Sequence, residues 1–135
     1  MNKKVLFVDD DLNILSAYKR QLHKHFEVET VDSGESALKL ISKQELFAVV
    51  VADMNMPGMN GVELLSKIRQ ETPETVRIML TGQADISTAM DAVNEGHIYR
   101  FLTKPCPIET LAKSLTAGVE QFRLVTAEKE LLEKH

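Results

Sequence analysis

The sequence lacks the features that define several classes of protein. A single cysteine, Cys106, occurs among 135 residues, which excludes an intrachain disulfide and an all-cysteine metal site and is typical of the reducing cytoplasm. No apolar run approaches the length of a membrane span, and the apolar stretch after Met1 is too short for a secretory signal. The net charge of -4 gives no basic footprint. We therefore expect a cytoplasmic chain that contacts neither membrane nor nucleic acid directly.

Histidine is also scarce. The chain has four, namely His23, His25, His97 and His135, and none of them directly follows a predicted strand. We interpret them as surface or packing residues rather than as metal ligands.

The central feature of the sequence is an apolar run from Phe47 that ends in one carboxylate, Asp53, shortly before Pro57-Gly58. Such a run is typical of a strand buried on both faces in the middle of a parallel sheet. Ligands of open α/β sheets bind at the carboxyl ends of their strands, and an ionised carboxylate loses hydration there. Asp53 is therefore the first functional candidate. A helix-capping or turn-forming aspartate is the alternative.

Strand and helix patterns alternate along the chain, which predicts a doubly wound parallel sheet with right-handed crossovers. The predicted strands are residues 4–8, 26–31, a run from 47, 76–80 and 98–102, and the predicted helices begin near residues 11, 34, 61, 85 and 107. The alternating strand at 26–31 suits a sheet edge. In the helix of residues 85–95 we expect Ile86, Met90 and Val93 to be buried and Gly96 to end the helix.

Polar residues follow the predicted strands, and parallel strands bring such corners together at one edge of the sheet. The corners hold Asp9, Asp10, Asp53, Thr81 and Lys104. With the strand order 2-1-3-4-5, the first two acids face Asp53 across the crevice where the order reverses. Two carboxylates about 4 Å apart repel by roughly 4 kcal/mol at an effective dielectric constant of about 20, so the cluster requires a cation or a proton. Oxygen ligands in an open site favour Mg²⁺.

One carboxylate beside a metal, a hydroxyl and an ammonium suits phosphoryl transfer. Asp53 would be the nucleophile that forms an acyl phosphate. The metal and Lys104 would neutralise charge on the transferring oxygens, and Thr81 would donate a hydrogen bond to one of them. Each residue also has a structural interpretation, because Lys104 could extend from a strand end to water and Thr81 could cap the next helix.

Four motifs at these corners resemble the receiver domain of two-component response regulators, over about residues 4–115. The motifs are Val8-Asp9-Asp10, Asp53-Met54-Asn55-Met56-Pro57-Gly58-Met59-Asn60-Gly61, Leu80-Thr81-Gly82 and Phe101-Leu102-Thr103-Lys104-Pro105. The resemblance implies a flavodoxin-like fold with strand order 2-1-3-4-5, five helices and an extended last helix. It also implies that a histidine kinase or histidine phosphotransfer protein donates a phosphoryl group to Asp53 in a reaction that requires Mg²⁺, for which Mn²⁺ can substitute.

The resemblance also implies residue roles. Asp10, Asp53 and the backbone carbonyl of Asn55 are the expected metal ligands, with Asp9 close by or acting through water. Thr81 is expected to bind the phosphoryl group together with Lys104.

Two further residues complete the expected site. Phe101 matches the family's aromatic switch, with an ordinary core aromatic as the alternative. Gln83, like Asn55, matches a position that tunes hydrolysis of the acyl phosphate. Such a domain catalyses its own phosphorylation and dephosphorylation without being a stand-alone enzyme, and it switches the surface around the helix from Asp85, the fifth strand and the last helix.

The last predicted helix runs from Pro107 toward His135, which is longer than packing on one domain requires. We expect residues 1–118 to form the receiver and residues 119–135 a helical extension toward a linker, a coiled coil or an output domain. Apolar residues at three-four spacing favour a homodimer through these helices, and a solvated tail is the alternative. The spaced positions are Ile108, Leu111, Leu115, Gly118, Phe122, Val125, Lys129 and Leu132.

Competing interpretations predict different chemistry. A flavin-binding module would carry a Ser/Thr/Gly-rich loop after the first strand, where this chain has three aspartates. An aspartate-based phosphatase would use the first acidic corner as its nucleophile and would not need Asp53, and a purely structural domain would tolerate its loss. Residues 94–101 resemble receivers fused to HD-GYP phosphodiesterases or to AAA+ activators.

Overall fold

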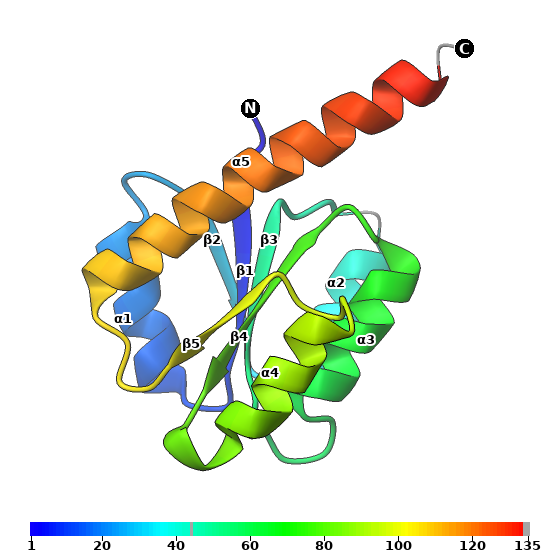
Figure 1. Ribbon diagram of the computed structural model, residues 1–135. Helices are drawn as coiled ribbons and strands as arrows, with labels where there is room; N and C mark the ends of the chain where they lie inside the picture. Colours follow the sequence, from blue (N-terminus) through cyan, green and yellow to red (C-terminus); the bar gives the residue numbers. More distant parts are fainter. Residues whose placement is uncertain (44, 134–135) are drawn as a thin grey trace.

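The computed structural model describes residues 1–43 and 45–133. Its strands are β1 (Lys4–Val8), β2 (Glu27–Val31), β3 (Val49–Asp53), β4 (Val76–Thr81) and β5 (Arg100–Thr103). Its helices are α1 (Leu12–Leu22), α2 (Gly34–Ser42), α3 (Gly61–Glu71), α4 (Ile86–Asn94) and α5 (Ile108–Glu133), with a 3₁₀ turn, η1 (Gln83–Asp85), before α4. The strands form one parallel sheet in the order β2-β1-β3-β4-β5 (Figure 1). The predicted flavodoxin-like architecture is confirmed.

Helices cover both faces of the sheet. One apolar core lies between the sheet and the pair α1 and α5, and the other lies between the sheet and α2, α3 and α4. All five residues of β3 are buried, as expected for the central strand, whereas β2 lies at the sheet edge. This layering places the end of β3 in the middle of the carboxyl edge, with a strand on each side.

The predicted buried face of α4 is wrong at Met90. Met90 is exposed, whereas Ala89 and Ala92 pack in the core below this helix, with Ile86 and Val93 only partly buried. Ala89 and Ala92 share one face of the helix with Ile86 and Val93, whereas the neighbouring Met90 is turned by about 100° from Ala89 toward solvent. Small side chains on that face let α4 lie close to the strands.

The last helix, α5, has a packed first half and a projecting second half. Leu111, Leu115 and Phe122 are buried against the sheet. Gly118 is buried as well, and a Cβ atom there would lie 2.9 Å from a Val49 methyl group, so the glycine lets α5 approach β3 closely. The predicted cover of the sheet by the first half is confirmed. His135 lies outside the described residues.

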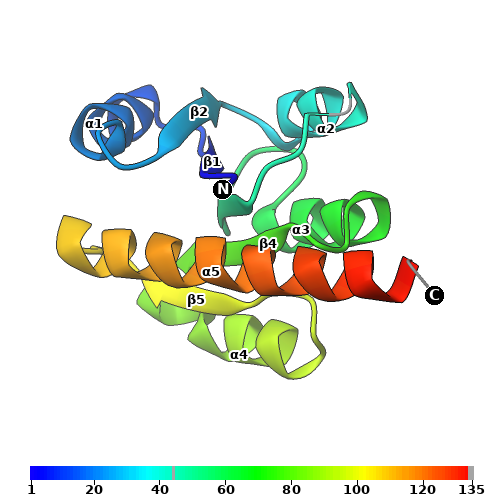
Figure 2. The same cartoon turned by 90° about the horizontal axis from the view of Figure 1, so that it is seen from above.

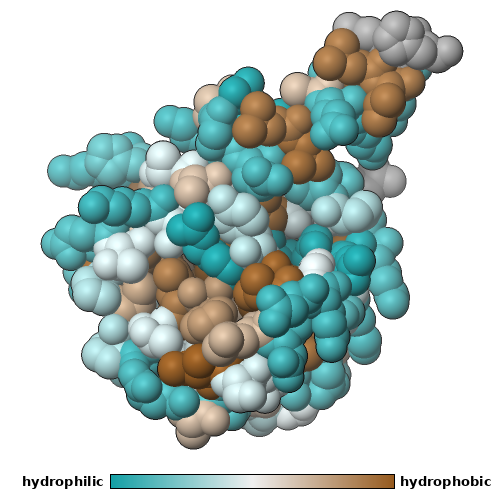
Figure 3. Space-filling model, viewed as in Figure 1, coloured by the Kyte–Doolittle hydropathy of each residue, from teal (hydrophilic) through white to brown (hydrophobic). Residues whose placement is uncertain are grey.

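Beyond the sheet, α5 extends past the other elements, as the views from the front and from above both show (Figures 1 and 2). Leu124, Leu131 and Leu132 are exposed on this segment. Apolar surface is visible on the projecting end in the space-filling view (Figure 3). Among the described residues, no helix is long and apolar enough to span a membrane.

Candidate functional site

The candidate site lies at the carboxyl edge of the sheet, where neighbouring strands deliver polar residues. Asp9 follows β1, Asp53 ends β3, Thr81 ends β4 and Lys104 follows β5. Backbone hydrogen bonds continue the pairing at this edge, because the Lys104 amide donates to the Thr81 carbonyl at 2.9 Å. The corners are therefore held in register by the backbone as well as by side-chain contacts.

An ion pair joins the ends of β3 and β5. Lys104 Nζ lies 2.6 Å from Asp53 Oδ1, although the residues are 51 positions apart in the sequence. The Asp53 side chain is 5% exposed and that of Lys104 is 37% exposed, so the ammonium reaches the buried carboxylate from the solvent side. Charge-assisted hydrogen bonds of this kind offset the lost hydration of a buried carboxylate.

Three carboxylates converge beside this ion pair. Oxygen atoms of Asp9, Asp10 and Asp53 lie within 4.8 Å of one another, with Asp9 and Asp53 buried and Asp10 exposed. Burial is the main cause that raises the pKa of Asp9, and the charges of Asp53 and Asp10 raise it further. The Asp11 amide and Lys104 act in the opposite direction. The ionised cluster is therefore destabilised by its own charge.

The cluster fits a hard divalent cation. Asp9 Oδ1 accepts the Asp11 amide at 2.9 Å, whereas the buried Asp9 Oδ2 has no hydrogen-bond partner among residues 1–43 and 45–133. A buried carboxylate oxygen without a partner is costly, and a nearby cation would compensate it. The side-chain atoms that could bind a metal here are all carboxylate oxygens, which suit Mg²⁺.

The loop after β3 is shaped by close backbone packing. A Cβ atom at Gly61 would lie 2.5 Å from the Asp53 carbonyl oxygen, and the Gly61 amide donates to the Met54 carbonyl at 3.0 Å. Gly58 has a φ of 76°, a conformation that favours glycine. The close approach at Gly61 depends on the path of the loop, which no sequence pattern specifies.

Thr81 is fully buried, and its hydroxyl group already has contacts within the protein. Thr81 Oγ1 contacts Met54 Sδ at 3.7 Å and donates to the Gly82 carbonyl oxygen at 3.3 Å. The hydroxyl is thus held by the loop after β3 and by the start of the β4–α4 connection.

The remaining predicted residues lie around this edge. Phe101 is partly buried and packs against the core on the α4 side of the sheet, and Gln83 is exposed in η1. The backbone amide of Asn55 donates to Asp53 Oδ1 at 3.3 Å, and its side-chain Nδ2 donates to Asp85 Oδ2 at 2.9 Å. No sequence pattern indicates the contact of Asp85, because it joins two loops.

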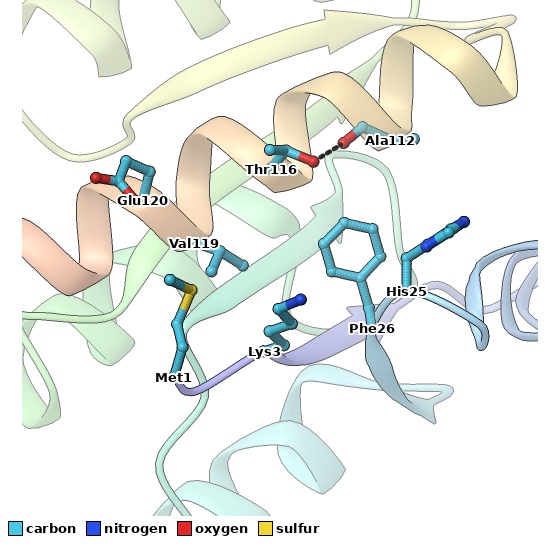
Figure 4. A pocket seen from close by; sticks show the side chains of 8 residues that line it. All are labelled: Met1, Lys3, His25, Phe26, Ala112, Thr116, Val119 and Glu120. Carbon is cyan, nitrogen blue, oxygen red and sulfur yellow. Dashed lines mark hydrogen bonds between the residues drawn. The ribbon is translucent and has the colours of Figure 1, made fainter.

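The described histidines lie away from these corners. His23 and His25 are exposed, and His97 lies 3.2 Å from Glu95 and 3.5 Å from Arg69 on another part of the molecule. A cavity of about 500 Å³ lies between α5 and the segments before β1 and β2, lined by Met1, Lys3, His25, Phe26, Ala112, Thr116, Val119 and Glu120 (Figure 4). It contains none of the predicted site residues. The predicted site residues therefore lie at the carboxyl edge of the sheet and not in this cavity.

Comparisons with known proteins agree with the fold and identify its family. Residues 5–116 match the family described as the response regulator receiver domain. The hydrogenase transcriptional regulatory protein HoxA of Cupriavidus necator is 37% identical over 116 residues, which are 86% of this chain and 24% of that protein. The chain thus spans about a quarter of that relative.

Solved structures share the fold. A structure described as adenylate cyclase from Rhodopirellula baltica is 47% identical, covers 100% of both chains and superposes with a TM-score of 0.98. A receiver domain protein from Clostridium thermocellum is 31% identical over 90% of this chain and 98% of its own, with a TM-score of 0.84.

Proposed function

Because the chain belongs to the family of response regulator receiver domains, we propose that Asp53 accepts a phosphoryl group from a phosphohistidine partner and that this modification switches the surface formed by α4, β5 and α5. The observation that carries the proposal is the meeting of three strand ends, where Asp53 lies 2.6 Å from Lys104 and within 4.8 Å of Asp9 and Asp10. Receiver domains interact with histidine kinases, and a kinase or a histidine phosphotransfer protein is the expected donor.

The hydrogen bonds around Asp53 suggest which oxygen reacts. Asp53 Oδ1 accepts hydrogen bonds from both Lys104 Nζ and the Asn55 backbone amide, so we assign nucleophilic attack to Asp53 Oδ2. The new bond joins this oxygen to phosphorus, and the phosphorus–nitrogen bond of the donor breaks, returning the electron pair to the histidine ring. Lys104 holds the carboxylate in place and stays close to the charge that the phosphoryl oxygens bring.

The metal proposal assigns roles to the remaining oxygens. Asp10, Asp53 and the Asn55 carbonyl would hold Mg²⁺ or Mn²⁺, with Asp9 beside them or acting through water. A bound divalent ion supplies positive charge that neutralises the phosphoryl oxygens during transfer. The buried, unpartnered Asp9 Oδ2 supports a cation at this place, within the described part of the chain.

The test is intact-mass measurement after incubation with acetyl phosphate and Mg²⁺. We expect one phosphoryl group on the wild-type chain and none on Asp53→Asn or in the presence of a chelator. Asp32→Asn is the matched control, because Asp32 is an exposed carboxylate that follows β2 at the same edge of the sheet. Equal modification of Asp53→Asn would contradict the proposal. Sustained hydrolysis of a phosphate ester would instead support a phosphatase, and bound flavin a flavin module.

The switch requires Thr81 to change its partners. Its hydroxyl is held by Met54 and Gly82 in the unmodified chain, and it would have to leave them to bind a phosphoryl group on Asp53. Phe101 is the proposed aromatic partner of this movement, since it packs on the α4 side of β5. Asn55 and Gln83 are the proposed positions that tune hydrolysis. Phosphorylation would then favour one of two arrangements of this surface.

We also propose that residues 1–118 form the receiver and that residues 119–135 extend it as a helix toward a second chain or an output domain. The exposed Leu124, Leu131 and Leu132 favour a homodimer through the projecting helices. Sedimentation analysis tests this proposal, because Leu131→Glu should weaken self-association, with Glu128→Gln on the same segment as a control. An unchanged monomer at all concentrations in the wild type would refute it.

The output is not specified by the receiver itself. HoxA is described as a transcriptional regulatory protein, whereas the relative from Rhodopirellula baltica is described as an adenylate cyclase. We infer that the same switch can serve different outputs.

A further inference from the structure

The loop after β3 and the turn before α4 are joined by a side-chain hydrogen bond. Asn55 Nδ2 donates to Asp85 Oδ2 at 2.9 Å, across 30 positions of sequence. Asn55 lies two residues after Asp53, and Asp85 is the last residue of η1, four residues after Thr81. The bond therefore links the two loops that carry the proposed phosphoacceptor and the proposed phosphoryl-binding hydroxyl.

Helix capping does not explain the aspartate at position 85. Asp85 occupies the residue before α4, where an aspartate usually accepts hydrogen bonds from the first amides of a helix, yet its side chain makes no capping hydrogen bond. By contrast, Asp11 before α1 and Asn60 before α3 both cap their helices in this way. The Asp85 carboxylate instead accepts the amide of Asn55.

The Gly82 carbonyl oxygen couples Asp85 to Thr81. It accepts the Thr81 hydroxyl at 3.3 Å and also the Asp85 backbone amide at 3.2 Å. A movement of the Thr81-Gly82 segment toward a phosphoryl group would therefore also shift the Asp85 backbone amide, whose hydrogen bond to Gly82 anchors η1. A Cβ atom at Gly82 would have no neighbour within 4 Å, so this segment has space to move.

We propose that Asp85 is a positioning residue of the phosphoryl site. Through Asn55 it holds η1 against the loop after Asp53 in the unphosphorylated chain, and this bond must open before Thr81 can bind the phosphoryl group. The inference rests on the proposed function of Asp53. In this hydrogen bond the Asn55 side-chain amide donates to the Asp85 carboxylate, and the amide oxygen of an asparagine at position 85 could accept it instead.

The test compares Asp85→Ala, which removes the acceptor, with Asp85→Asn, which keeps an acceptor oxygen but removes the charge. A hydrogen bond of ordinary net strength changes a population by about threefold to tenfold. We expect Asp85→Ala to speed acyl phosphate formation from acetyl phosphate by about threefold. Without Mg²⁺, it should also speed hydrogen exchange of the backbone amide at position 85 by a similar factor. Asp85→Asn should restore both rates. Asp91→Ala, an exposed acid on α4, is the charge control.

A double-mutant cycle isolates the bond. In amide exchange measured without Mg²⁺, Asn55→Ala combined with Asp85→Ala should give no larger change than Asp85→Ala alone, because each variant removes the same hydrogen bond. Additive effects would overturn the proposal, and so would Asp85→Asn rates equal to those of Asp85→Ala, since charge alone would then explain them.

Failure of the inference can be distinguished from failure of the proposed function. If the wild-type chain accepts no phosphoryl group, the function fails, while amide exchange still reports on the bond. If exchange changes but the phosphorylation rate does not, the bond exists without controlling the site, and the inference is overturned.

Discussion

Asp9→Asn should stabilise the metal-free chain, although it removes a residue of the proposed site. Asp9 is 3% exposed, and its carboxylate lies within 4.8 Å of those of Asp10 and Asp53. At 4.8 Å and an effective dielectric constant of about 20, each pair of charges repels by roughly 3.5 kcal/mol. Water around the exposed Asp10 screens its repulsion of Asp9, and the charge of Lys104 offsets part of the repulsion between Asp53 and Asp9. We expect a net gain of about 1–2 kcal/mol at pH 7.

The direction of this effect with pH follows from the raised pKa of Asp9. The unfolded chain releases this proton at a lower pH than the folded chain, so the folded state loses stability as pH rises through the interval between the two pKa values. The advantage of Asp9→Asn should therefore be full above the raised pKa of the folded state. It should disappear below the ordinary aspartate pKa of about 3.9.

Thermal unfolding in a chelating buffer measures the effect. The expected gain corresponds to a rise in Tm of about 3–8 °C for a chain of this size. Adding Mg²⁺ should stabilise the wild type more than the variant, because a ligand stabilises the state that binds it. Asp32→Asn, at an exposed position, should change little. A metal-free Asp9→Asn chain that is equal to or less stable than the wild type would refute the reasoning.

Three further predictions follow from single contacts. Lys104→Met removes the ammonium 2.6 Å from the buried Asp53 carboxylate and should lower the free energy of unfolding by about 1–3 kcal/mol in urea without metal. This value allows for solvent screening, because the lysine side chain is 37% exposed. An unchanged urea midpoint would contradict the prediction. Gly61→Ala would place a Cβ atom 2.5 Å from the Asp53 carbonyl oxygen and should lower the free energy of unfolding by about 2–3 kcal/mol. Gly82→Ala places its Cβ atom in open space and should leave stability unchanged. Equal melting temperatures of the two variants would refute this prediction. Asp11→Ala should lower stability by about 1 kcal/mol in the same assay, because its side chain caps α1, and no loss would argue against that cap.

The strands and the convergence of the corner residues could be predicted from the sequence because both follow from local patterns and from parallel topology. The run that ends at Asp53 is buried throughout, and the strand order brings Asp9 and Lys104 to the same edge. These features require no knowledge of loop conformation.

Features that depend on how elements approach one another could not be predicted. The predicted burial of α4 was wrong at Met90, because the small side chains of Ala89 and Ala92 face the sheet instead. Gly118 interrupts the apolar spacing of the last helix, and only the structure shows that its missing side chain allows contact with β3. The bond between Asn55 and Asp85 joins two loops, and no periodic pattern in the sequence indicates it.

Locating the phosphoryl group on the chain tests the central claim most directly. After incubation with acetyl phosphate and Mg²⁺, reduction with borohydride converts an aspartyl phosphate to homoserine, and peptide mass mapping identifies the position. We expect conversion at Asp53 alone, beside the buried ion pair with Lys104. Conversion at Asp9 or Asp10 with Asp53 unchanged would contradict it.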